Sequence, residues 1–197
     1  NAREESYSKI TPIFLAVETG DLEIVQMLLD AGAKVRIRSE SKETPLMRLD
    51  QDATPELVEL LVKYGARVNA ADSEGQTALI HAVEYSTPAA AQALIAAGAD
   101  VNAANNEGVT ALMKAAERGD IDTARALIVA GAYINARDKE GDNAWVYTDD
   151  SAIEELLMSY GIEITPEQRA KHDGTTPVVD ATPEATPEPT PEPTPAS

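Results

Sequence analysis

The residue types that most often carry chemistry are scarce in this chain of 197 residues, which has two histidines and no cysteine. The lack of cysteine excludes a thiolate nucleophile, a disulfide and a cysteine-based metal site. His81 has no second histidine or cysteine nearby to complete a metal pair, and His172 lies in a proline-rich segment. We therefore interpret His81 as a surface or interface residue and predict no metal site and no imidazole catalysis.

Carboxylates are abundant, but their spacing does not favour catalysis or calcium binding. Turns that combine acidic or amide residues with glycine occur at 72–75, 105–108 and 138–141. A calcium loop needs alternating ligands followed by a distal bidentate glutamate, and these turns lack that pattern. The adjacent Asp149 and Asp150 are more typical of a solvated chain segment than of a hydrolytic pair. We predict a non-enzymatic protein with no catalytic residues, no cofactor and no metal.

The overall charge excludes several classes of partner. The chain has 34 acidic and 16 basic residues, a formal net charge of −18. Nucleic-acid binding requires clustered lysine and arginine, and anionic membranes attract basic segments, so neither partner is expected. No apolar run approaches the roughly 20 residues that a membrane helix needs. A protein partner that is basic, or that presents basic patches, is the expectation that remains.

A period of 33 residues organises most of the chain. It relates three sets of positions: Gly32-Ala33, Gly65-Ala66, Gly98-Ala99 and Gly131-Ala132; Thr11, Thr44, Thr77 and Thr110; and Val35, Val68, Val101 and Ile134. Each copy predicts a helix, a turn, a second helix and an extended loop, with threonine as N-cap and glycine after the second helix. A fifth, shorter copy follows, in which Gly161 arrives three residues early.

One such unit cannot bury its own apolar face, so the copies must stack. We predict one domain over residues 1–164, with repeats at about 6–38, 39–71, 72–104, 105–137 and 138–164. The expected core consists of Ile13, Leu46, Leu79, Leu112, Ile24, Val25, Leu28, Leu29, Leu57, Val58, Leu61, Val62, Leu94, Ile95, Leu127 and Ile128.

The segment 165–197 differs in composition from the repeats. It holds eight of the twelve prolines and no aromatic residue. Such a Thr/Pro/Glu-rich segment buries too little apolar surface to offset its ordering entropy, so a disordered or polyproline-II tail is predicted. A flexible spacer, an O-glycosylated stalk and a proline-rich ligand remain alternatives for its role.

The repeats resemble the ankyrin family, whose signature is T-P-L-H-x-A within 33 residues. The matching segments begin at Thr11, Thr44, Thr77 and Thr110, and the closing G-A-D-V-N pattern is complete in Gly98-Ala99-Asp100-Val101-Asn102. This resemblance implies an all-α solenoid of about five repeats, each with a helix pair and a hairpin loop. It also implies a protein–protein interaction module.

The sequence departs from the family pattern at several points. The motif histidine is replaced in every copy, by Phe14, Met47, Ile80, Met113 and Val146. Leu49 and Asp50 stand where two small residues are usual, so the packing of the first helix of copy two is left open. Lys42 stands where later copies have a turn glycine, which predicts a looser hairpin tip.

The two ends of the array differ. Copy five has a polar outer face and is expected to be a cap. Copy one keeps Leu15 and other apolar residues on its outer face, so either Tyr7 and its neighbours cover that face or the array was longer. The missing initiator methionine, the lack of cysteine and the Thr/Pro-rich tail favour an exported protein, with a cytoplasmic protein as the alternative.

Side chains that are not needed for the core of the repeats are the candidates for partner binding. On the first helices, residues at i, i+3 and i+4 share a face that stacking aligns into one concave stripe. The stripe residues are Leu15, Glu18, Arg48, Gln51, Asp52, His81, Glu84, Tyr85, Lys114, Glu117, Arg118 and Tyr147. By the family resemblance, the hairpin tips add Glu43, Glu74, Gln76, Glu107 and Glu140.

Tyr85 and Tyr147 are the preferred anchors, followed by Arg48 and Arg118, because aromatic residues and arginine dominate interface hot spots. The predicted function is a non-enzymatic module that binds a protein. A structural or surface-assembly protein, and an adaptor region of a larger enzyme or effector, remain alternatives.

Overall fold

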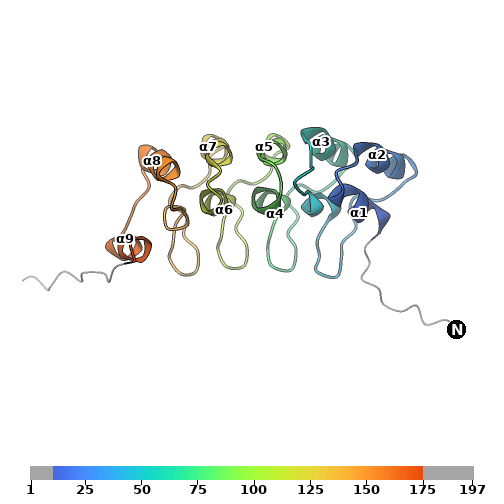
Figure 1. Ribbon diagram of the computed structural model, residues 1–197. Helices are drawn as coiled ribbons and strands as arrows, with labels where there is room; N and C mark the ends of the chain where they lie inside the picture. The colour runs from blue at the N-terminus through green and yellow to red at the C-terminus, as the bar shows by residue number, and fades with distance from the viewer. Residues whose placement is uncertain (1–10, 175–197) are drawn as a thin grey trace, which may run out of the picture.

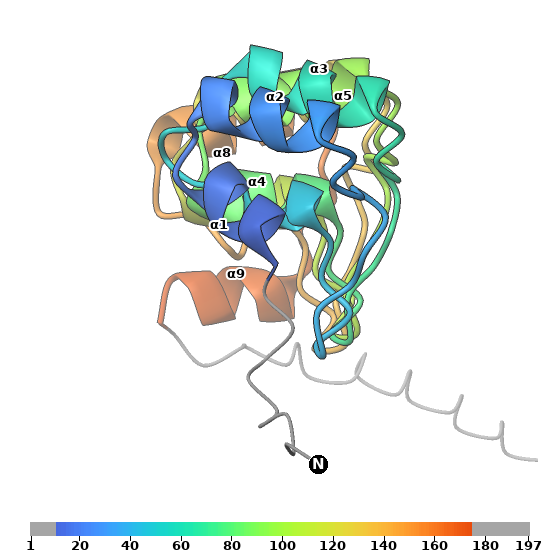
Figure 2. The same ribbon diagram turned by 90° about the vertical axis from the view of Figure 1, so that its right-hand side faces the viewer.

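The computed structural model describes residues 11–174, which form a row of stacked helix pairs (Figure 1). The inner layer contains α1 (Pro12–Glu18), the 3-10 helix η1 (Pro45–Arg48), α4 (Ala78–Tyr85) and α6 (Ala111–Glu117). The outer layer contains α2 (Leu22–Asp30), α3 (Pro55–Lys63), α5 (Pro88–Ala96), α7 (Ile121–Val129) and α8 (Ser151–Ser159). Hairpin loops project from the inner layer, and α9 (Pro166–His172) follows α8 (Figure 2). The predicted all-α solenoid is confirmed, except that the fifth repeat has turns at residues 144–147 in place of a first helix.

Threonine and aspartate side chains cap most of the helices, as the repeats predict, but the hydroxyls of Thr11 and Thr44 have no hydrogen-bond partner among the described residues. The Thr77 and Thr110 hydroxyls accept hydrogen bonds from the third backbone N–H of α4 and α6, both at 3.4 Å. The Asp120 carboxylate does the same for α7 at 3.0 Å. These contacts satisfy N–H groups that have no partner within the helix, so the helix pairs begin at the same place in successive repeats.

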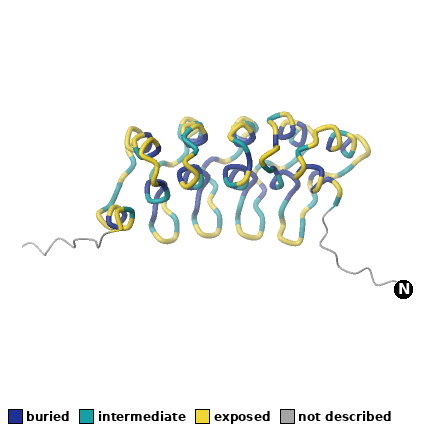
Figure 3. Tube along the Cα trace, viewed as in Figure 1, coloured by how far each residue is buried: buried dark blue, intermediate teal, exposed yellow. Residues whose placement is uncertain are grey.

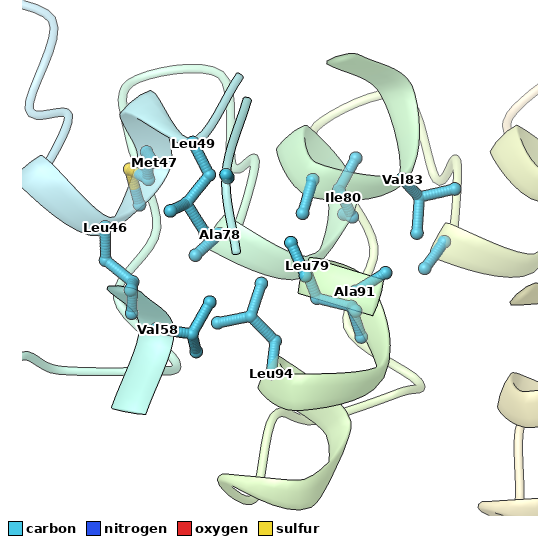
Figure 4. Close-up of a cluster of buried hydrophobic side chains, with 14 of the residues drawn as sticks. Leu46, Met47, Leu49, Val58, Ala78, Leu79, Ile80, Val83, Ala91 and Leu94 are labelled. Carbon is cyan, nitrogen blue, oxygen red and sulfur yellow. The ribbon is translucent and has the colours of Figure 1, made fainter. Parts of the chain in front are cut away.

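The core lies between the two layers and continues from repeat to repeat (Figure 3). Leu46, Leu79 and Leu94 are fully buried and belong to one cluster of apolar side chains, which also contains Val58 (Figure 4). Most of the predicted core residues are buried or pack against buried neighbours. The prediction that Ile24 is a core residue is wrong, because its side chain is 47% exposed. It lies in the first described repeat, and no helix pair precedes this repeat within residues 11–174.

The first helix of the second repeat is a single turn of 3-10 helix rather than an α-helix. Leu49 follows it in an extended conformation and is buried. The equivalent positions of other repeats hold Ala16, Ala82 and Ala115, which fit between packed inner helices. A leucine is too large for that helical position, so the chain opens after Arg48 and Leu49 enters the core from the extended segment (Figure 4).

Two methionines replace the motif histidine and occupy buried positions in the inner layer. The backbone N–H groups of Thr44 and Thr110 donate to the sulfur atoms of Met47 and Met113, at 3.2 and 3.4 Å. Sulfur is a weak acceptor, so these contacts give each helix start a weaker link than an imidazole would provide.

The acidic hairpin tips are turns, as predicted. In the third repeat, Asp72 Oδ1 accepts the backbone N–H groups of Glu74 and Gln76 at 2.8 and 2.9 Å. Neighbouring tips are also joined, because the N–H of Asn106 donates to the carbonyl of Glu74 at 2.8 Å. These carboxylates therefore organise the tips by binding backbone groups.

The C-terminal segment corrects the prediction that an extended tail starts at Thr165. Thr165 and Gln168 form a reciprocal cap at the start of α9, and Gln168 also donates to the carbonyl of Gly141 at 2.9 Å. Gln168 and Ala170 are buried against the fifth repeat. His172, expected to carry no role, stacks on Trp145. The rest of the predicted tail, residues 175–197, lies outside the described residues.

Candidate partner-binding surface

The inner helices and the hairpins present one continuous face, here called the inner face. It carries the residues that recur at the same repeat position: Leu15, Arg48, His81, Lys114 and Tyr147. Their side chains range from half-buried to exposed, whereas the preceding residue in four of these repeats is buried. In each of these four repeats, one side chain therefore points into the core and the next points toward solvent.

The first site on the inner face is a hollow of about 360 Å³, here called the Arg48 hollow. Its lining comes from the first three repeats: Glu18, Glu43, Met47, Arg48, Leu49, Asp50, His81 and Tyr85. Five of the predicted binding residues, Glu18, Glu43, Arg48, His81 and Tyr85, thus share one opening.

Hydrogen bonds hold the polar walls of the Arg48 hollow in place. Arg48 Nη2 lies 3.1 Å from Glu43 Oε2, and His81 Nε2 lies 3.1 Å from Asp72 Oδ2. The Arg48 Nε atom is buried and has no hydrogen-bond partner among the described residues. Tyr85 is 56% exposed beside the His81 ring, with 6.1 Å between the ring centroids. The hollow therefore combines a fixed polar wall with an exposed aromatic ring.

A network around Lys114 occupies the middle of the inner face. Lys114 Nζ lies 3.0 Å from Glu117 Oε2 and 3.3 Å from Glu84 Oε1, and the Arg118 guanidinium donates to the backbone carbonyl of Glu84. Burial lowers the pKa of Lys114, but the hydrogen bonds to Glu117 and Glu84 outweigh it, so the pKa is raised overall. Burial, together with the neighbouring Glu84, also raises the pKa of Tyr85. Lys114 thus stays charged and is already paired.

The second site is a hollow of about 410 Å³ near the fifth repeat, here called the Tyr147 hollow. Its lining consists of Glu107, Val109, Glu117, Asp138, Lys139, Glu140, Asp142, Val146, Tyr147 and Lys171. The Tyr147 hydroxyl donates to Asp138 Oδ2 at 2.7 Å. Burial, followed by this hydrogen bond, raises the pKa of Tyr147. Because its hydroxyl is engaged and its ring is half-buried, Tyr147 is a less accessible anchor than Tyr85.

Helix α9 contributes a cation to the Tyr147 hollow. Lys171 Nζ lies 2.9 Å from Glu140 Oε2 and also pairs with Asp142. Hydrogen bonds to Asp142 and Glu140 raise the pKa of Lys171. The sequence prediction missed Lys171, although the Thr165-Pro166 pair repeats the helix-start signal seen at Thr54-Pro55 and Thr87-Pro88.

Some predicted residues do not join either hollow. Gln51 and Asp52 are exposed but share no helical face with Arg48, because η1 ends at Arg48. This corrects the predicted grouping. Leu15 lies at the N-terminal end of the array, where it borders a separate apolar hollow with Ile24. Glu74 is exposed at its hairpin tip, and Gln76 is half-buried below it.

The described side chains do not gather in a way that suggests metal binding or membrane insertion. Within residues 11–174, no group of three or more histidine, aspartate and glutamate side chains is arranged to hold a metal ion. In the same range, no helix has the length and apolarity that a bilayer crossing requires. What the inner face does offer is a row of polar and aromatic side chains set around two hollows.

Stacked helix pairs with projecting hairpins define a repeat solenoid, a fold class that presents an extended surface. The sequence matches the family model described as Ankyrin repeats (3 copies) over residues 1–71, 46–138 and 87–168. The chain belongs to the ankyrin repeat family, as its repeat motifs indicate. Ankyrin repeats are generally protein–protein interaction modules and are typically non-enzymatic. Comparison with curated proteins gives no match.

Proposed function

We propose that this chain binds a protein partner through the inner face, which forms the concave stripe together with the hairpin tips. The observation that supports the proposal is the Arg48 hollow, where Arg48 from the second repeat and His81 and Tyr85 from the third surround one opening. Three chemically different side chains at neighbouring repeat positions give a surface that can select one partner. This arrangement favours recognition over catalysis, which would need a nucleophile or base aimed at a reacting atom.

Tyr85 and Arg48 are the proposed anchors. Tyr85 offers an exposed ring, and the Arg48 side chain is 31% exposed and held by Glu43. A partner that supplies an acceptor to the exposed part of this guanidinium would gain a charge-assisted hydrogen bond. Both residue types are enriched where binding energy concentrates at protein interfaces.

The charge of the inner face supports a basic partner. The Arg48 hollow carries the carboxylates of Glu18, Glu43 and Asp50, and its single arginine is paired with Glu43. The whole chain has a formal net charge of −18. Such a field steers positively charged partners toward the face and repels acidic ones.

A crosslinked pull-down from the source cells tests the proposal. The baits are the natural chain, the double variant Tyr85→Ala/Arg48→Ala, and the matched control Tyr133→Ala/Arg125→Ala, whose exposed residues lie in the loop after α7 and on α7. The proposal requires a protein retained by the natural chain and the control but lost by the double variant, with unchanged helical circular dichroism. A partner retained equally by all three would reject the inner face.

One observation favours end-to-end assembly as a second candidate function. Leu15 and Ile24 are 55% and 47% exposed and line an apolar hollow of about 420 Å³ at the N-terminal end of the array. Light scattering over a range of concentrations tests this alternative. If the natural chain self-associates and the Leu15→Lys variant does not, assembly is supported. If the natural chain is a monomer at all concentrations, assembly is excluded.

A further inference from the structure

A groove separates α2 and α3 in the outer layer, on the opposite side of the helix pairs from the inner face. The two helices are neighbours in the outer layer and contact each other (Figure 1). The groove has a volume of about 770 Å³, larger than the two inner hollows of about 360 and 410 Å³. Its lining consists of Leu22, Glu23, Gln26 and Met27 from α2, and Glu56, Glu59, Leu60 and Lys63 from α3.

The repeat sequence explains why the groove lies here. Met27 and Leu60 occupy a repeat position that is Ala93 in α5 and Ala126 in α7. Alanine permits close helix approach, and α3 packs more closely along α5 than along α2. The longer side chains keep α2 and α3 apart and leave apolar surface between them.

A hydrogen-bond network fixes the far end of the groove. The Tyr64 hydroxyl donates to Asp30 Oδ1 at 2.5 Å, and Gln26 Nε2 donates to the same oxygen at 2.8 Å. Tyr64 follows α3 and Asp30 ends α2, so the contact joins the C-terminal ends of the two helices. The groove is therefore formed before any ligand arrives, which lowers the entropic cost of binding.

The groove has an apolar floor and an acidic rim. Leu22 and Met27 are 38% and 65% exposed, well above the values of core residues. Glu23, Glu56 and Glu59 border them, and Lys63 is the one cation in the lining. A hydrogen bond from its own backbone N–H, followed by one with Thr54, lowers the pKa of Glu56, so this carboxylate remains ionised at neutral pH.

We propose that this groove docks a basic amphipathic helix of a partner protein, independently of the inner face. Two neighbouring helices form ridges between which a third helix can pack, and apolar anchors at i and i+4 would cover Leu22 and Met27. Lysine or arginine residues beside those anchors would meet Glu23, Glu56 and Glu59. The segment from residue 22 to residue 27 spans about 8 Å of helix axis, which matches about one and a half turns of such a helix.

Methionine-methyl NMR tests the proposal on the full chain. Of the four methionines, Met27 lies in the groove and Met158 is 47% exposed on α8, while Met47 and Met113 are buried. The probe is an amidated 14-residue helical peptide with leucine at positions 2, 6, 9 and 13, and lysine and alanine elsewhere. Saturable shifts of the Met27 methyl without shifts of Met158 support the groove. No shift of Met27, or equal shifts of both, overturns it.

Matched variants separate groove binding from general attraction to an acidic protein. Met27→Glu removes the apolar floor and should weaken peptide binding at least about tenfold. Val129→Glu adds the same charge at a 74% exposed position on α7 and should change binding less than twofold. Equal weakening by both variants would overturn the proposal. The proposal would also be overturned if sedimentation showed that the natural chain is a dimer and that Met27→Glu dissociates it, because a second copy would then occupy the groove.

Discussion

The imidazole of His172 stacks on the indole of Trp145, with 4.1 Å between ring centroids and 26° between ring planes. His172 Nε2 donates to the carbonyl of Thr148 at 2.7 Å. Arg169 approaches the same indole, with its guanidinium carbon 5.5 Å from the ring centroid. These contacts attach α9 to the fifth repeat and cover the only tryptophan in the chain. The helix therefore serves as a C-terminal cap on the array.

The docking of α9 should depend on pH through His172. Burial lowers the pKa of His172, but the hydrogen bond to Thr148 and the carboxylates of Asp173, Glu154 and Asp149 raise it above 6.5 overall. A raised pKa in the folded state means that the contribution to stability is complete below about pH 6.5 and is lost as the pH rises through the folded-state value. Thermal unfolding between pH 5.5 and 8.5, followed by tryptophan fluorescence, should show this loss.

The control for the pH prediction is His172→Gln, which cannot change charge. It should remove the pH-dependent part of the stability while His81 remains in place. His172→Ala should also destabilise the chain by about 1 kcal/mol at low pH, from the lost ring stacking. An unchanged pH profile in His172→Gln would show that another group is responsible.

Lys42→Gly should stabilise the protein. Lys42 has φ of 63°, a left-handed conformation that costs a residue with a Cβ roughly 1–2 kcal/mol. The equivalent position in the next repeat is Gly75. We expect a gain of about 1 kcal/mol in urea unfolding. Lys139→Gly makes the same change at a tip residue that is not in this conformation, and should give no gain. Equal effects of the two variants would refute the explanation.

Gly108→Ala should destabilise more than Gly131→Ala. Both glycines have positive φ, 83° and 94°, so both variants carry the left-handed cost of roughly 1–2 kcal/mol. A Cβ at Gly108 would also lie 2.9 Å from Cα of Asp138 in the next hairpin, whereas nothing lies within 4 Å at Gly131. We expect a further loss of about 1–3 kcal/mol for Gly108→Ala in urea unfolding. Equal losses would show that the hairpins can separate freely.

Added salt should slow association with the partner proposed for the inner face. Raising the ionic strength from about 0.01 M to 0.15 M shortens the screening length from roughly 30 Å to 8 Å. Attraction between the acidic face and a basic partner would then weaken, which lowers the association rate more than it raises the dissociation rate. Stopped-flow kinetics measures both rates. An association rate that does not respond to salt would contradict a basic partner.

Much of the fold follows from the sequence because the same residues recur every 33 positions. Thr77 and Thr110 start helices, and the buried leucines Leu46 and Leu79 connect successive repeats, as predicted. The shortened helix at η1 was not predictable in detail, because it depends on whether Leu49 fits between neighbouring helices. Helix α9 was predictable in part from Thr165-Pro166 but was concealed by the proline-rich composition around it.

The candidate site was predictable only in outline. The repeat positions of Arg48, His81 and Tyr85 identify an exposed row, but their shared hollow depends on how three repeats stack. Asp50 enters that hollow because η1 ends early, and no local pattern indicates this. The groove between α2 and α3 depends on the size of Met27 and Leu60 at a position that is alanine elsewhere, which appears only when the repeats are compared.

The most direct test of the account is a calorimetric titration of the captured partner against three proteins. These are the natural chain, Tyr85→Ala/Arg48→Ala and the control Tyr133→Ala/Arg125→Ala. A hot-spot residue contributes about 2 kcal/mol or more, so the loss of one such anchor weakens binding about 30-fold. The double variant should therefore bind at least about 30-fold more weakly, and the control within twofold. Equal affinity of the natural chain and the double variant would contradict the claim that the Arg48 hollow holds the partner.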